Sequence, residues 1–255
     1  MGSEALKNKA TVGGLRPIEQ YFTPIGSSVT GEFVAARSSF RMNSSDKGIL
    51  FAADYMPLLE KYLDRASYYM GCALCQIADT MENFAEREIN LDYLTLPLPV
   101  NLLKARDFKA NIIEATAKLR LNRSKICIEL PSYLYNETDG KAAEMIKSLQ
   151  KDEFLVMIDS FGGTAATSYR LAEFEANYVL LDPALTALAA KRGRPASTVK
   201  SMVSLASDLG TSVIATNVAN EDEGEAVAEA GCSNCTGAFV GSEVSRQYFR
   251  IDRKE

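Results

Sequence analysis

The sequence predicts an α/β fold of the (β/α)8 barrel type, and three observations support this prediction. The 255 residues are 47% apolar and 24% charged, a composition with enough apolar side chains for one barrel-sized core. Short apolar runs alternate with stretches of helical periodicity, which is typical of a parallel sheet built from βα units. Polar residues end several of the apolar runs, and barrels carry their chemistry at the carboxyl ends of their strands.

Strands are expected where an apolar run is bounded by turn residues. The first two, 18–23 and 32–42, flank a glycine-serine turn at 26–28. Residues 1–17 are polar and are expected to be a flexible lead-in to one domain over 18–255. The remaining strands are expected at 94–101, 125–130, 154–158, 178–181, 211–215 and 236–240.

Helices are expected where apolar residues recur at a spacing of three and four. Ser197 is the expected N-cap of one of them, because a serine hydroxyl accepts hydrogen bonds from the free amides of a first helical turn. The expected helices are 51–63, 66–81, 108–119, 140–149, 168–173, 197–209 and 221–230. For a chain of this length a closed barrel is a better prediction than an open sheet.

The stretch from Glu153 to Thr167 is central to the functional prediction. Its apolar run, Phe154 to Ile158, is typical of a strand buried on both faces, and Asp159 closes that run. Gly162 and Gly163 then turn the chain toward a helix. Asp159 is therefore either a side chain of the barrel mouth or a simple cap of the following turn.

Composition excludes several classes of function. The net charge of −5 argues against general nucleic-acid binding. No run reaches the roughly 18 apolar residues of a membrane span, and the start of the chain lacks a signal-peptide core, so we expect a cytoplasmic protein. Histidine is absent, which excludes an imidazole base and a histidine-ligated metal.

The cysteines allow two interpretations. Cys72 with Cys75, and Cys232 with Cys235, form two C-x-x-C pairs of the kind that bind zinc. The first pair, however, lies in a helical apolar pattern, where cysteines are usually small core residues. Reduced structural thiols are therefore the favoured interpretation, with zinc as the alternative.

Successive candidate strands end in polar side chains, which a barrel brings together at one mouth. These residues are Asn101, Glu129, Asp159, Asp182, Thr216 and Thr236. Three of them, Asn101, Glu129 and Asp159, offer hard oxygen ligands of the kind that suit Mg²⁺ or Mn²⁺.

Nearly the whole chain resembles the EAL domains, which hydrolyse cyclic di-GMP. The segments that carry the resemblance, in order, are Tyr21 to Ile25, Val100-Asn101-Leu102, Ile128-Glu129-Leu130, Asp159-Ser160-Phe161-Gly162, Leu181-Asp182 and Gly231 to Gly237. The resemblance implies a barrel whose carboxylates hold two divalent metals. A metal-activated water then attacks one phosphodiester, with a lysine orienting that water.

The departures from the family pattern fall on the residues that this chemistry needs. By the resemblance, the glutamate of the E-A-L motif is replaced by Arg37, and the lysine by Leu180. The other degenerate positions are Ser160, Thr216, Ala219 and Thr236. An arginine in place of a metal-binding glutamate changes the local charge by two units and repels a dication. We therefore expect a pseudoenzyme with no cofactor, or with Mg²⁺ or Mn²⁺ if any metal binds to the remnant Asn101, Glu129 and Asp159.

Two positions are open for the guanidinium of Arg37. It either bridges Glu129 and Asp159 in place of a metal, because its planar donors match paired carboxylates, or it points to solvent.

Three functions remain open after these departures. The favoured one is a regulatory module that binds another protein, and Tyr68 with Tyr69 is a candidate homodimer face. The second is a receptor that binds cyclic di-GMP without cleaving it. Its candidate ligand-binding residues are Arg37, Arg41, Gly162 and Gly163, where Arg41 matches a phosphate-contacting arginine of the family. The third is a residual metal-dependent phosphodiesterase. The mouth segments offer little aromatic surface for guanine beyond Tyr133 and Tyr169, which favours the first function.

Overall fold

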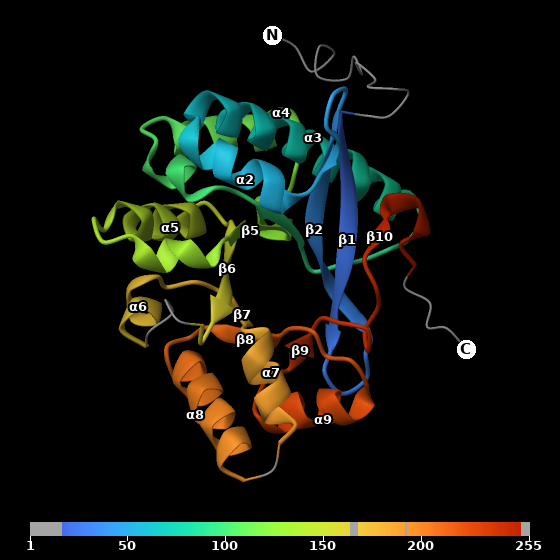
Figure 1. Cartoon of the computed structure of the whole chain (residues 1–255). Helices are drawn as coiled ribbons and strands as arrows, with labels where there is room; N and C mark the ends of the chain where they lie inside the picture. Colours follow the sequence, from blue (N-terminus) through green and yellow to red (C-terminus); the bar gives the residue numbers. More distant parts are fainter. Residues whose placement is uncertain (1–16, 164–167, 192, 251–255) are drawn as a thin grey trace.

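A computed structural model describes residues 17–163, 168–191 and 193–250, so most of the predicted lead-in lies outside the described residues. The eight strands of the barrel are β1 (Ile18–Ser27), β2 (Phe33–Ser44), β4 (Leu94–Pro97), β5 (Ile126–Leu130), β6 (Leu155–Phe161), β7 (Tyr178–Leu181), β8 (Ser212–Ala215) and β9 (Asn234–Cys235). Strand β2 and strands β4 to β9 pair in parallel along the chain, and β1 closes the barrel by pairing antiparallel with both β2 and β9 (Figure 1). The predicted closed barrel is confirmed.

Helices surround the barrel and cover the outer faces of its strands (Figure 1). They are α2 (Ala52–Lys61), α3 (Leu63–Glu86), α4 (Phe108–Lys118), α5 (Lys141–Lys151), α6 (Ser168–Glu173), α7 (Pro183–Ala189), α8 (Arg194–Asp208) and α9 (Glu221–Glu229). Short 3-10 turns follow or join the strands: η1 (Val100–Lys104), η2 (Arg123–Lys125), η3 (Ser132–Asn136) and η4 (Arg246–Tyr248). Two further strands, β3 (Gly48–Leu50) and β10 (Val244–Ser245), extend the edges of the sheet.

Two apolar cores follow from the alternation of side chains along each strand. The larger core lies between the strands and the surrounding helices. The smaller core fills the inside of the barrel and consists of Ile25, Ala35, Tyr93, Cys127, Met157, Leu180 and Ile214. Each strand thus contributes one residue in two to the inside, which decides where its polar side chains point.

Several predicted boundaries are wrong. Asp182 follows strand β7 as predicted, but it is also the N-cap of helix α7, which the sequence did not predict, and it accepts a hydrogen bond from the Ala184 amide at 2.9 Å. Helix α8 begins at Arg194, so Ser197 is not its N-cap. The last barrel strand is Asn234–Cys235 rather than 236–240. Strand β4 ends at Pro97, which places Asn101 in η1 instead of in a strand.

Two further predictions concerned the state of the cysteines and the presence of a membrane span. All five cysteines are free thiols, and burial raises the pKa of Cys232 to about 12, so its thiol stays protonated at neutral pH. No helix in the described part of the chain is both long and apolar enough to cross a membrane.

Candidate functional site

The mouth of the barrel is a polar layer stacked directly on the inner apolar core. On each strand the polar residue stands two positions after an inward-facing apolar one, and a spacing of two keeps both side chains on the same face. In this way Ala35 is followed by Arg37, Cys127 by Glu129, and Met157 by Asp159. The sequence therefore builds a charged site from strands β2, β5 and β6.

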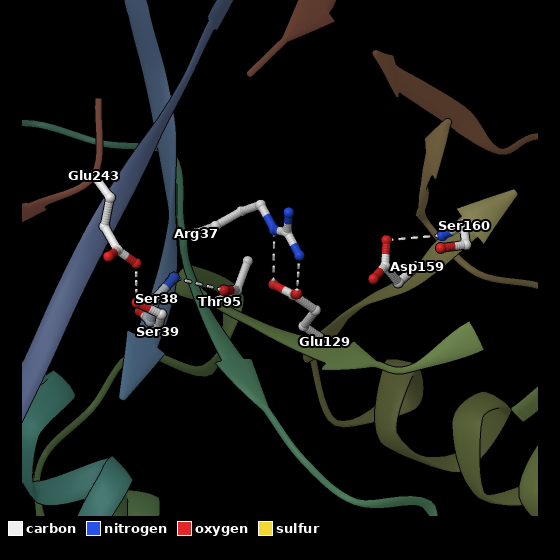
Figure 2. Close-up of polar contacts among 8 residues, drawn as sticks. All are labelled: Arg37, Ser38, Ser39, Thr95, Glu129, Asp159, Ser160 and Glu243. Atoms are coloured by element: carbon white, nitrogen blue, oxygen red, sulfur yellow. Dashed lines mark hydrogen bonds and ion pairs between the residues drawn. The ribbon is translucent and has the colours of Figure 1, made fainter. Parts of the chain in front are cut away.

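Arg37 and Glu129 form a forked ion pair across the mouth (Figure 2). The Nε of Arg37 donates to one carboxylate oxygen of Glu129 at 3.3 Å, and Nη2 donates to the other. The side chains are only 26% and 10% exposed, respectively. Both oxygens of Glu129 thus accept hydrogen bonds from Arg37, the residue that the resemblance places where the family has a metal-binding glutamate.

Asp159 faces the same mouth, but no ion pair joins it to Arg37 (Figure 2). Of the two carboxylates that the guanidinium was predicted to bridge, Arg37 therefore pairs only with Glu129. Its Oδ1 accepts a hydrogen bond from the Ser160 amide at 2.8 Å. Burial acts to lower the pKa of Arg37, but the carboxylates of Glu129 and Asp159 outweigh it and raise that pKa. Arg37 therefore remains charged at all relevant pH values.

The pKa of the Asp159 carboxyl is raised, chiefly by burial. The Arg37 charge opposes this rise, and the Glu129 charge adds to it. A raised carboxyl pKa means that the folded state favours the protonated form, so ionisation of Asp159 at neutral pH costs stability. That cost disappears as the pH falls through the raised pKa.

We expect Asp159→Asn to increase the free energy of unfolding at pH 7, with a gain that shrinks steadily toward about pH 4. The amide removes the charge and retains an oxygen that accepts from the Ser160 amide. Urea unfolding of both proteins across this pH range measures the difference. A variant that is less stable than the wild type at pH 7 would contradict the prediction.

Asn101, the third predicted ligand, serves helix α2. Its Nδ2 donates to the main-chain oxygens of Leu59 at 2.7 Å and Glu60 at 3.0 Å, at the end of that helix. Glu60 in turn accepts from the amides of Val100 and Asn101 and from the Tyr133 hydroxyl. The Asn101 Oδ1 is buried and has no hydrogen-bond partner among the described residues.

The predicted turn after β6 is tight. Ser160 has a left-handed backbone with φ of +56°, and its oxygen accepts from the Gly163 amide at 3.1 Å. Gly162 has φ of +84°, and a Cβ there would meet Leu185 Cδ1 at 2.1 Å, so glycine is required. Ser160 follows Asp159 directly, and its side chain is a hydroxyl (Figure 2).

The other positions that the resemblance predicts to be degenerate mostly have structural roles. Leu180 is fully buried in the inner apolar core. The Thr216 hydroxyl donates to the Leu181 oxygen at 2.7 Å, and Thr236 is buried where β8 and β9 meet. Ala219 is exposed before α9. None of these side chains is a base or a carboxylate.

Arg41 is held by a partner that sequence reasoning missed. Its Nη2 pairs with Glu243 Oε2 at 2.7 Å, and its guanidinium carbon lies 3.5 Å from the centroid of the Tyr21 ring. Ser39 also donates to Glu243 (Figure 2). Glu243 and Glu60 gave no sequence signal, because single glutamates in a loop and in a helix are usually solvated.

The two tyrosines of the predicted dimer face, Tyr68 and Tyr69, differ in exposure. Tyr69 is buried and packs against the rings of Phe40 and Tyr55. Tyr68 alone of the two lies at the surface.

The mouth does not fit a divalent metal as its residues are arranged. The described residues contain no cluster of three or more cysteine, aspartate or glutamate side chains that could hold an ion. Glu129 is engaged by a cation through both oxygens, and Asn101 uses its amide group to hold the end of α2. A dication would have to displace a guanidinium of the same sign.

Comparisons with known proteins agree on one fold. The family model of the EAL domain matches residues 14–243. The cyclic di-GMP phosphodiesterase RocR of Pseudomonas aeruginosa is 23% identical over 235 residues, which are 91% of this chain and 58% of RocR. This chain thus spans less than two thirds of that relative.

Solved structures at low identity share the architecture. The EAL enzyme Bd1971, with cAMP and cyclic di-GMP bound, superposes with a TM-score of 0.78 at 16% identity, over 96% of this chain and 65% of Bd1971. The FimX EAL domain of Xanthomonas citri, in complex with cyclic di-GMP, gives 0.74 at 16% identity, over 98% of this chain and 96% of that domain. At these identities the likeness shows the fold.

Proposed function

Because the chain belongs to the EAL domain family, we propose that it is a catalytically inactive member that acts in cyclic di-GMP signalling as a regulatory, protein-binding module. The ion pair between Arg37 and Glu129 carries this proposal. It neutralises Glu129 with a side chain of the protein where the hydrolytic members of the family need metal ions.

Electrostatics supports the loss of hydrolysis. A guanidinium about 4 Å from a metal ion, at an effective dielectric constant of about 20, opposes each unit of its charge by about 4 kcal/mol. The mouth also lacks a carboxylate at Ser160 and an amine at Leu180, which lies in the apolar core. Activation of a water by two metals therefore has neither its ligands nor its orienting group.

A receptor for cyclic di-GMP is the second candidate, and one feature of Arg37 favours it. Among the described residues, the Nη1 of Arg37 has no hydrogen-bond partner, and Figure 2 shows it pointing away from Glu129. A phosphate oxygen is a suitable acceptor for it. Against this candidate, Arg41 is committed to Glu243 and Tyr21 and is poorly placed to bind a phosphate.

Titration calorimetry with cyclic di-GMP tests both candidates, first in EDTA and then in Mn²⁺, with chromatography of the nucleotide afterwards. We expect no linear product in either buffer, while a hydrolytic EAL domain such as RocR yields it under the Mn²⁺ condition. Linear product from this chain would overturn the proposal and indicate a residual phosphodiesterase.

The heat of binding separates the two inactive functions. Binding that is the same in EDTA and Mn²⁺, with the nucleotide recovered intact, and that is lost in Arg37→Met, would establish the receptor. Absence of binding in both buffers is the result expected of a protein-binding module.

A further inference from the structure

A groove lies between helices α3 and α4, which are neighbours on the outside of the barrel (Figure 1). We name it the helix groove, and its volume is about 970 Å³. It reaches Leu94, the first residue of β4, and Lys125, which directly precedes β5 and donates to the Leu91 oxygen at 2.6 Å. These are the amino ends of the two strands. The helix groove therefore lies at the end of the barrel opposite to the mouth with Arg37 and Glu129.

The lining of the helix groove is apolar at its base. Apolar side chains that pack against the outer core also line the groove, and they are Met81, Phe84, Ile89, Leu91, Leu119 and Leu121. In the described part of the chain, no residue of this lining has a buried side-chain nitrogen or oxygen without a hydrogen-bond partner. A small polar ligand needs such groups to fix its orientation. The base is therefore suited to an apolar surface of a larger partner.

The two sides of the helix groove carry opposite charge. Asp79 and Glu82 lie on the α3 side, at a spacing of three that keeps them on one face of the helix. Lys118 and Arg120 lie on the other side, at the end of α4 and just after it. Lys118 also pairs with Glu114, one turn back on α4, but that pair is exposed and contributes little. A complementary partner presents positive charge to α3 and negative charge to α4.

The dimensions and the surroundings of the helix groove favour a helix as its occupant. The part of α3 that lines it, from Ala78 to Ala85, spans about 10 Å at the rise of 1.5 Å per residue, which is about two helical turns. Because the groove lies between two helices, it offers no sheet edge to which a strand could add. Polyproline segments dock on exposed aromatic rings, whereas Phe84 and Tyr93 in this lining are only 4% and 3% exposed.

We propose that the helix groove binds an amphipathic helix of a regulatory partner protein. The apolar side chains of that helix recur at a spacing of three and four and lie on the base of the groove. Its basic flank faces Asp79 and Glu82, and its acidic flank faces Lys118 and Arg120. This proposal rests on the proposed function, because it assigns the surface through which the protein-binding module holds its partner.

Fluorescence anisotropy of a labelled model peptide, titrated with the whole chain, tests the groove. The peptide is alanine-rich, has about 14 residues, and carries leucines at a spacing of three and four between a flank of lysines and a flank of glutamates. A covalent link between two solvent-facing side chains keeps it helical, and circular dichroism checks this. We expect saturable binding.

A variant that fills the groove should weaken this binding at least tenfold. Ala85 is an exposed residue of the lining near the end of α3, so Ala85→Arg places a large side chain in the groove without disturbing the core. The matched control is Ala187→Arg, at an exposed alanine in the last turn of α7 that does not line the groove. The control should bind like the wild type. Equal binding by the two arginine variants would overturn the proposal.

Reversing one charge tests the assignment of the two flanks. Glu82 is exposed, and Glu82→Lys makes both sides of the groove positive. We expect this variant to bind the first peptide at least threefold more weakly and to prefer a second peptide whose flanks are both glutamate. The wild type should prefer the first peptide. The same preference in both proteins, with matching circular dichroism spectra, would contradict the assigned charges.

The helix groove and the proposed function fail separately. A wild type that does not bind the helical peptide, while cyclic di-GMP is recovered intact from the Mn²⁺ buffer, would exclude the groove and leave the inactive protein-binding module in place. Linear product from cyclic di-GMP would overturn the proposed function whatever the peptide does.

Discussion

Replacing Arg37 with methionine is expected to reduce the free energy of unfolding by about 3 kcal/mol, a large fraction of the 5–15 kcal/mol typical of a domain. The loss arises because Glu129 is nearly buried and accepts both hydrogen bonds from Arg37. Methionine has a similar length and leaves that carboxylate without a counter-charge. Urea denaturation at pH 7 measures the change.

Three further variants test whether the loss of stability comes from the ion pair or from the packing of the Arg37 side chain. Glu129→Met should cost less than Arg37→Met, because Arg37 is 26% exposed and its free charge can reach water. The double variant should recover most of the loss, since two apolar side chains often replace a buried pair at little cost. The exposed pair of Lys118 with Glu114 on α4 is the control, and Lys118→Met should change little. Additive losses in the double variant would contradict the pairing.

Periodicity predicted the barrel well because it is a local signal. The strand at 178–181 and the helix at 168–173 were predicted at the bounds that the structure has, and the charged mouth residues Glu129 and Asp159 were placed on the correct strands. A spacing of two along a buried strand determines which side chains face the inside. The polar layer of the site was therefore predictable from sequence.

The pairing within the site was less predictable, because it depends on contacts between distant residues. Nothing local to Arg37 distinguishes a contact with Glu129 from a bridge to Asp159, and the structure has the first. The ion pair of Arg41 with Glu243 joins residues separated by 202 positions. Helix α7 was missed because aspartate followed by proline is common both in turns and at the start of a helix, and Asp182 and Pro183 begin a helix here.

Arg37→Glu is expected to create a metal site at the mouth of the barrel. The substitution removes the cation from Glu129 and places a third carboxylate beside Glu129 and Asp159, in the oxygen-rich setting that Mn²⁺ and Mg²⁺ prefer. Without metal, R37E should be less stable than Arg37→Met, because like charges then crowd the mouth. With Mn²⁺ at a hundred times its Kd, binding should return about 2.7 kcal/mol and raise the Tm.

Thermal unfolding in EDTA and in a Mn²⁺ series measures this gain, and Arg37→Gln provides the comparison. The glutamine removes the same positive charge without adding a ligand, so a rise in Tm confined to R37E reports the new carboxylate rather than the vacated space. Glu129→Gln introduced into R37E should weaken the rise, because it removes one of the ligands that Arg37 occupies in the native protein. An equal rise in the wild type would mean that Mn²⁺ binds elsewhere. In that case the guanidinium of Arg37 does not substitute for a metal ion.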